Sequence, residues 1–137
     1  MRVFLLSCGK TKGPAPARAI ELYKGPLFRR MLRYARNRNP DAMFILSAKH
    51  GLLRPQEVIA PYERTLKTMS VGELNEWADR VVSQLRRQTD LDRDHFTVLA
   101  SKKYRLHLLS HLRHHCVPMA GLRLGEQLRF LDREANP

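Results

Sequence analysis

Residues 1–13 read MRVFLLSCGKTKG, an apolar run that ends at Ser7 and is followed by a small residue, a glycine and two lysines. Three more short apolar runs occur along the chain, namely MFILS (43–47), FTVLA (96–100) and HCVPM (115–119). Helical patterns separate them, and this alternation is typical of βαβ units and a parallel sheet. The sequence therefore predicts an α/β fold with three layers, in which helices flank a small, mainly parallel four-stranded sheet. We expect a single domain over residues 1–137, because the length is close to the commonest domain size.

Four segments carry the apolar spacing of helices. GPLFRRMLRYARN (25–37) has Pro26 just inside its start and repeats apolar residues at steps of three and four. Ahead of LNEWADRVVSQLRR (74–87), Ser70 and Glu73 form a capping-box pattern, which predicts that a helix begins there. Leucines at helical spacing also predict helices in KYRLHLLSHLRHH (103–115) and GLRLGEQLRFLDR (121–133).

The chain has a strong excess of positive charge. Its 25 Lys and Arg residues outnumber 13 Asp and Glu residues, which gives a formal charge of +12. Such a field attracts polyanions, nucleic acid first among them, although the same charge also serves solubility alone. Cys8 and Cys116 lie far apart in a chain without a signal-peptide pattern, so we expect reduced thiols in a cytoplasmic protein. No run approaches the roughly 18 apolar residues of a bilayer span, and we expect no membrane association.

Three of the predicted strands end in a serine with lysine close behind it. The segments are Ser7-Cys8-Gly9-Lys10-Thr11-Lys12, Ser47-Ala48-Lys49-His50-Gly51 and Ser101-Lys102-Lys103-Tyr104. Because parallel strands place their carboxyl ends at one edge of a sheet, hydroxyls, backbone amides and ammonium groups should converge there. This set of donors suits a phosphate or a departing anionic base. The alternative is that these lysines are only solvated charges in loops. The repetition of the pattern at three strand ends favours the anion site.

The glycine pattern excludes two common phosphate-binding motifs. GKTKG (9–13) lacks the upstream glycine of G-x-x-x-x-G-K-[ST], and no G-x-G-x-x-G follows a strand. The sequence therefore gives little support for ATP and none for a dinucleotide, and we expect no cofactor.

A long stretch without helical pattern, GLLRPQEVIAPYERTLKTMS (51–70), follows the second predicted strand. Loops of this length in compact domains are often functional. This one offers Tyr62, a ring on which a base can stack, and Glu63, an acid near the predicted crevice. The alternative is that Tyr62 only packs and that Glu63 only pairs with Arg64.

Two further clusters suggest other chemistry. One is the run of histidines before Cys116, namely His107, His111, His114 and His115. It lacks both an H-E-x-x-H pattern and a second ligand pair, so we expect no metal site. The other is Cys8, a rival nucleophile with His50 as its base, since nearby lysines favour a thiolate. No third residue that would orient the base is evident, and a small buried residue needs no such role.

Three blocks resemble the small bacterial and phage proteins of domain-of-unknown-function family 6884. They are LLSCGKTKGPAPARAIELYKGPLF (5–28), FILSAKHGLLRPQEVIAPYERTL (44–66) and GLRLGEQLRFL (121–131), and the resemblance runs from about Val3 to Leu131. That family is distantly similar to peroxide-stress YaaA-type proteins and to the lysine-bearing domain of archaeosine synthase. The strand-end arrangement is also similar to that of uracil-DNA glycosylases. The resemblance implies an α/β domain that acts on a nucleobase, for example as a glycosylase for a modified pyrimidine. The acidic residue that uracil-DNA glycosylases carry after their first strand is replaced here by Ser7–Lys12, so their mechanism does not carry over.

Residues and resemblance together predict a DNA glycosylase that releases a modified or damaged pyrimidine, such as 5-hydroxymethyluracil or an oxidised base, from a nucleotide flipped out of duplex DNA. The predicted catalytic residues are Lys49, Lys10 and Glu63. A lysine donates a hydrogen bond to the departing base or attacks the sugar, and the glutamate stabilises the positive charge that develops on the sugar. The predicted substrate-binding residues are Ser7, Cys8, Gly9, Lys12, Ser47, His50, Tyr62, Ser101 and Lys102, with phosphate contacts from Arg29, Arg30 and Arg33. The alternatives are a non-catalytic DNA- or RNA-binding module and an enzyme that acts on free nucleosides or nucleotides. We expect no obligate protein partner.

Overall fold

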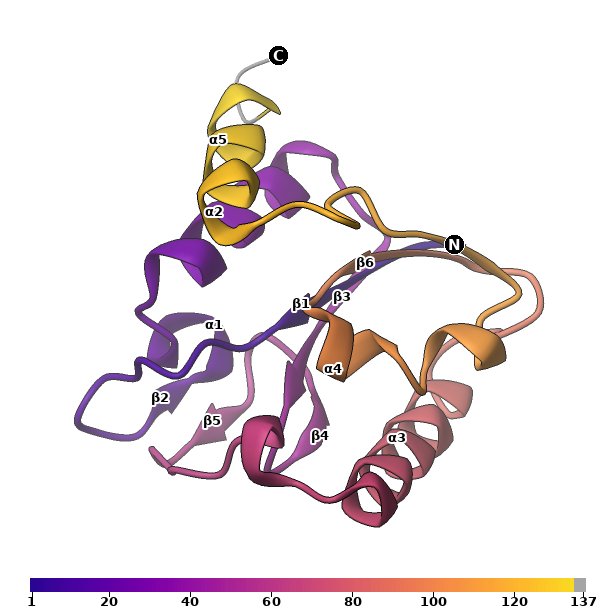
Figure 1. Ribbon diagram of the computed structural model, residues 1–137, viewed down its shortest axis with the longest axis horizontal. Helices are drawn as coiled ribbons and strands as arrows, with labels where there is room; N and C mark the ends of the chain where they lie inside the picture. Colours follow the sequence, from indigo (N-terminus) through magenta and orange to yellow (C-terminus); the bar gives the residue numbers. More distant parts are fainter. Residues whose placement is uncertain (135–137) are drawn as a thin grey trace.

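The computed structural model describes residues 1–134, which are built around a five-stranded sheet of order β4-β3-β1-β6-β7 (Figure 1). The strands are β1 (Arg2–Ser7), β3 (Ala42–Ser47), β4 (Gly51–Leu53), β6 (His95–Leu99) and β7 (His114–Cys116). Neighbours pair in parallel except β3 and β4, which are antiparallel. The predicted α/β fold with a mainly parallel sheet is confirmed, whereas the predicted number of four strands is wrong.

Helices cover both faces of this sheet. They are α1 (Ala19–Leu22), α2 (Pro26–Asn37), α3 (Val71–Arg86), α4 (Lys102–Arg105) and α5 (Leu124–Glu134), with short 3-10 turns η1 (Leu66–Thr68) and η2 (Leu109–His111). In Figure 1, α2 and α5 lie together on one side of the sheet and α3 lies on the other. Residues of β1 alternate between two cores: Val3 and Leu5 pack with α3, and Phe4 and Leu6 pack with α1, α2 and α5.

The two helices with the strongest local signals form where the sequence predicts them. α2 begins at Pro26 and buries Phe28, Met31 and Ala35 of its apolar stripe. α3 follows a complete capping box, in which the Ser70 side chain accepts from the Glu73 amide and the Glu73 carboxylate accepts from the Ser70 amide. Local residues determine both helix starts, so local reasoning finds them.

The helix predicted over 103–115 is wrong. The chain forms only α4 and η2 there, and the last predicted strand shortens to β7, whose three residues are exposed. The first turn of α4 has no side-chain cap and no acid, and it carries lysines where the helix dipole disfavours cations. Leu108 and Leu112 nevertheless pack in the core. The spacing of the leucines therefore indicated which of these side chains are buried, although it predicted the wrong secondary structure.

The predicted irregular stretch over 51–70 contains regular elements. β4 lies at its start, β5 (Val58–Ile59) pairs antiparallel with β2 (Ala17–Arg18), and η1 lies near its end. β4 pairs with β3 and is the fifth strand of the main sheet. Its residues Leu52 and Leu53 are buried in the two cores on opposite faces. In the described part of the chain, no helix has the length and hydropathy that crossing a bilayer demands.

Candidate functional site

The carboxyl ends of β1, β3 and β6 meet at one edge of the sheet, as the sequence predicts. β1 lies between the other two and is parallel to both. Ser7 and Ser47, the last residues of β1 and β3, are both buried; Ser7 lies opposite Leu46, one residue before Ser47, and the Cys8 amide donates to the Leu46 carbonyl at 3.0 Å. Ser101 comes two residues after β6 and is exposed at the start of α4. This edge is the natural ligand site of a parallel sheet.

Five polar side chains converge just beyond these strand ends, and we call Cys8, Tyr23, Ser47, Tyr62 and Tyr104 the hydroxyl cluster. The Tyr62 hydroxyl is 2.6 Å from both the Tyr23 hydroxyl and Ser47 Oγ, and 3.7 Å from Cys8 Sγ. Cys8 Sγ is in turn 3.4 Å from the Tyr104 hydroxyl. The cluster joins β3, α4 and three connecting segments, including the one that directly follows β1.

Two lysines and a histidine surround the Tyr62 ring. Lys12 Nζ is 4.4 Å from the ring centroid and Lys49 Nζ is 5.9 Å from it, both within cation–π range. The His50 ring meets Tyr62 edge-on, with 5.4 Å between centroids. The predicted residues Lys12, Lys49, His50 and Tyr62 are therefore brought together by the fold.

Burial controls the protonation of these groups. It raises the pKa values of Tyr23, Tyr62 and Tyr104 above the ordinary tyrosine value, so their hydroxyls stay neutral and able to donate near pH 7. Burial, followed by the nearby Lys49 and Arg80 charges, lowers the pKa of His50. Neutral His50 keeps Nε2 buried without a hydrogen-bond partner among the described residues.

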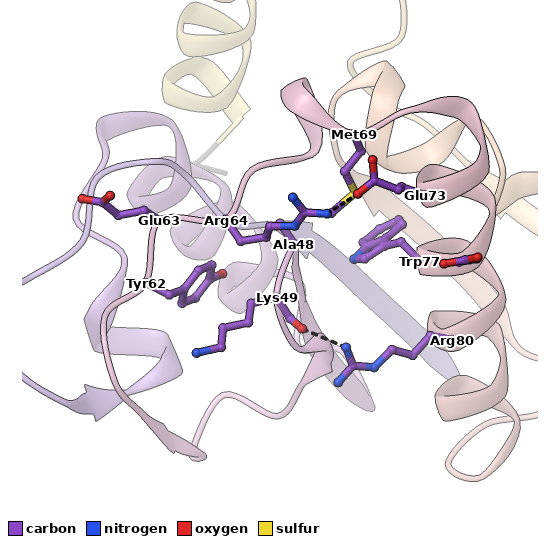
Figure 2. Close-up of a pocket in the computed structure, with 10 residues that line it drawn as sticks. Ala48, Lys49, Tyr62, Glu63, Arg64, Met69, Glu73, Trp77 and Arg80 are labelled. Atoms are coloured by element: carbon purple, nitrogen blue, oxygen red, sulfur yellow. Dashed lines mark hydrogen bonds and ion pairs between the residues drawn. The ribbon is translucent and has the colours of Figure 1, made fainter.

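A pocket of about 580 Å³ lies next to the hydroxyl cluster, between the loop that carries Tyr62 and helix α3 (Figure 2). Its lining residues are Ala48, Lys49, Tyr62, Glu63, Arg64, Met69, Glu73, Glu76, Trp77 and Arg80. Figure 2 shows the Lys49 side chain running below the Tyr62 ring and away from α3, while Trp77 projects from α3 toward the pocket. Lys49 and Tyr62 thus belong to both the pocket and the surroundings of the cluster.

Three contacts hold the pocket walls in place. Arg64 of the loop pairs with Glu73 of α3 at 2.6 Å, and Arg80 donates to the Lys49 carbonyl at 2.8 Å. The buried indole of Trp77 donates to the Ser47 carbonyl at 2.8 Å. The alternative in which Glu63 pairs with Arg64 is not what the structure has, because Arg64 binds Glu73 and the Glu63 side chain points away from the other labelled residues (Figure 2).

Other predicted site residues lie at the margin. Lys10 and Lys102 are exposed, and the Lys10 carbonyl accepts a hydrogen bond from Lys12 Nζ. Gly9 has open space where a side chain would project, so the backbone there does not require glycine for lack of room.

The arginines predicted to bind phosphate lie on α2, where α5 contacts them. Arg30 and Arg33 both bind Asp132 of α5 at 2.9 Å, whereas Arg29 is exposed. The fold therefore gives two of these three cations a carboxylate of the same chain.

The histidine run does not form one helix face. His107 lies between α4 and η2, His111 ends η2, and His114 belongs to β7. Within residues 1–134, no three side chains of the His, Cys, Asp and Glu types gather in a way that would hold a metal ion.

Sequence reasoning missed several members of the site. Tyr23 lies between α1 and α2, and Trp77 reads as an ordinary core residue of α3. Tyr104 directly follows the lysines after β6, and this position was the one available signal. The pocket lining also includes Arg64, Arg80 and the α3 glutamates Glu73 and Glu76, which come together only because the loop folds against α3.

Comparison with known proteins identifies the family without naming an activity. No solved structure matches the chain. The chain is 30% identical over 143 residues to "Uncharacterized protein YfjM" of Bacillus subtilis (strain 168), an alignment that covers 96% of this chain and 93% of that protein. Residues 3–133 match a family described as "Family of unknown function (DUF6884)". The span of this match and the similarity to YfjM show that the chain belongs to the family DUF6884.

Proposed function

We propose that this protein is a DNA N-glycosylase that releases a modified pyrimidine from a flipped nucleotide. The observation that carries the proposal is the adjacency of the hydroxyl cluster to a pocket whose walls hold both lysine and carboxylate groups. The pocket volume falls in the range of ordinary small-molecule sites. The formal charge of +12 favours a polyanionic substrate over a neutral one.

The chemistry of base release needs two opposite kinds of group. When the bond between sugar C1′ and the base nitrogen breaks, its electron pair leaves with the base and positive charge develops on the sugar. Donors must therefore face the base, and a carboxylate or a nucleophile must face the sugar. Lys49 supplies an ammonium donor on the pocket wall. Exposed Glu63 lies at the outer rim with its carboxylate pointing away from the pocket (Figure 2), so its side chain must turn inward to face the sugar.

Two routes to products use these residues. In the hydrolytic route, water adds to C1′, its proton goes to Glu63, and the departing base receives a hydrogen bond or proton from Lys49. In the covalent route, the Lys49 amine attacks C1′ and the electron pair of the C1′–N bond leaves with the base. The base takes up the proton that the attacking nitrogen loses, the sugar ring opens to form an imine, and water hydrolyses the imine. The two routes differ in whether a protein–DNA bond ever forms.

The test is a panel of duplexes that each contain one modified pyrimidine, including 5-hydroxymethyluracil and oxidised thymine, together with an unmodified duplex. After incubation with the protein, heating in alkali cleaves the strand wherever a base has been lost. We expect cleavage at one or a few modified pyrimidines and none in the unmodified duplex.

Two results would replace the proposal with an alternative. Binding of duplexes without cleavage of any panel member would identify a non-catalytic DNA-binding module. Release of base from free nucleosides, with every duplex left intact, would identify a small-molecule enzyme.

A further inference from the structure

The seven lysines of the chain all lie beyond the carboxyl ends of the parallel strands or beside the elements that follow them. They are Lys10, Lys12, Lys24, Lys49, Lys67, Lys102 and Lys103, and we call this set the lysine edge. Lys10 and Lys12 follow β1, and the Lys24 amide bonds to the Thr11 carbonyl of the same segment. Lys49 follows β3, and Lys102 and Lys103 form the start of α4 after β6.

Lys67 joins this set through a contact between η1 and α4. Lys103 Nζ donates to the Lys67 carbonyl at 3.3 Å, so the two lysines are neighbours. The Tyr104 hydroxyl is 3.4 Å from Cys8 Sγ, which ties α4 to the hydroxyl cluster. The lysines of η1 and α4 therefore border the candidate site. Figure 1 shows α4 close to the end of β1.

Within the described part of the chain, several arginines, unlike the lysines, are paired with acids. Among residues 1–134, every side-chain cation in an ion pair is an arginine and none is a lysine. On the face formed by α2 and α5, Asp132 binds Arg30 and Arg33, and Glu134 lies within ion-pair distance of Arg38. The two lysine amines with a recorded hydrogen bond, those of Lys12 and Lys103, instead bind backbone carbonyls, which leaves their charge uncompensated.

We propose that the lysine edge binds the DNA phosphate backbone, and that Arg30 and Arg33 of α2 do not. This inference rests on the proposed function for its choice of DNA as the polyanion. A cation that neutralises a phosphate releases condensed counterions, which drives binding and makes it salt-dependent. Arg30 and Arg33 would first have to leave Asp132, whereas no lysine among residues 1–134 forms an ion pair with an acid. A compact, flexible ammonium also suits contacts that carry no base specificity.

The experiment compares two double variants that each remove two positive charges. One is Lys67→Gln with Lys103→Gln, and its matched control is Arg30→Gln with Arg33→Gln, the two α2 arginines that bind Asp132. Affinity for an unmodified duplex is measured by fluorescence anisotropy at several salt concentrations between about 50 and 300 mM, where the slope of log K against log salt counts phosphate contacts. Each lost contact reduces that slope by about 0.9, so we expect the lysine variant to lose about 1.8 and the arginine variant less than about 0.5.

A second lysine pair, Lys24→Gln with Lys102→Gln, should lose the same slope of about 1.8, which a folding defect local to the first pair would not produce. Thermal unfolding is recorded for all variants. Equal loss of slope in the lysine and arginine variants, or a larger loss in the arginine variant, would overturn the inference. So would salt-insensitive binding by the native protein. Because the duplex contains no modified base, the result is separable from the proposed base release: either can fail while the other stands.

Discussion

The lysine edge and the face formed by α2 and α5 both carry many cations, yet they are organised in opposite ways. On the α2–α5 face, Arg30 and Arg33 share one carboxylate oxygen of Asp132, and Arg38 lies within ion-pair distance of Glu134. At the lysine edge, ammonium groups lie over the Tyr62 ring or contact backbone carbonyls. The net charge of a protein therefore does not locate its polyanion site, because the compensation of each cation by nearby acids must be known as well.

The largest effect should come from Lys49, the lysine shared by the pocket and the surroundings of the hydroxyl cluster. We expect Lys49→Ala to reduce base release by about two orders of magnitude or more, the usual scale for one catalytic donor, while duplex binding weakens only modestly. Single-turnover rates at saturating protein measure the first quantity. The matched control is Lys24→Ala, an exposed lysine of the same edge outside the pocket lining, which should keep its rate under those conditions.

Borohydride separates the two routes of the proposed reaction. If Lys49 attacks the sugar, the native protein is trapped covalently on its substrate and Lys49→Ala is not. If no trapping occurs although the rate needs Lys49, the amine serves the departing base and Glu63→Gln is the next variant. An unchanged rate in Lys49→Ala would contradict the assignment of Lys49 to the reaction, and the contrast between the lysine edge and the α2–α5 face would then rest on salt-dependent binding alone.

The fold could be predicted where local chemistry decides it. Pro26 removes one unpaired backbone N–H from the first turn of α2, and the capping box of Ser70 and Glu73 satisfies two at the start of α3. Both signals are local, so they mark the helix starts independently of the rest of the chain. The segment 103–115 has leucine periodicity but no cap at its start, and pairing of β7 with β6 determines its path instead. β4 was missed because its three residues are too few for a pattern, and its pairing with β3 is what identifies it.

The residues of the site likewise fall into those that the sequence predicts and those that only tertiary packing brings in. Ser7, Ser47 and Lys49 could be predicted to share an edge, because the parallel rule converts three strand ends into one location. Tyr23 and Tyr104 could not, since each reaches Tyr62 or Cys8 only through tertiary packing. Lys12, rather than Lys10, proved to be the lysine over Tyr62, a difference that depends on the turn between them.

An intermediate effect on stability should separate the two regions. Trp77→Phe removes the buried indole donor to the Ser47 carbonyl, and an unsatisfied buried acceptor typically costs about 1–3 kcal/mol. Arg33→Gln removes one exposed ion pair to Asp132 and should cost no more than about 1 kcal/mol. Urea unfolding of both variants measures the difference. A larger loss in Arg33→Gln would mean that ion pairs, and not the buried contacts behind the lysine edge, dominate the stability of this fold.

The smallest effect concerns pH and the single histidine at the lysine edge. His50 packs edge-on against Tyr62, with Lys49, Arg80 and Glu57 as its charged neighbours, and only Glu57 favours its protonation. Burial and the two cations hold the pKa of His50 below its ordinary value of 6.5, so between these two values the unfolded chain binds more protons than the folded one. This contribution to stability is therefore complete above about pH 6.5 and is lost as the pH falls toward the lower folded-state value. Urea unfolding at intervals from pH 5 to 7.5 should give a difference between the native protein and His50→Gln that is constant above pH 7 and shifts against the native protein on acidification. A stability difference that does not change with pH, or that shifts in favour of the native protein, would show that burial and the nearby cations do not lower the pKa of His50. It would also weaken the contrast between the lysine edge and the α2–α5 face.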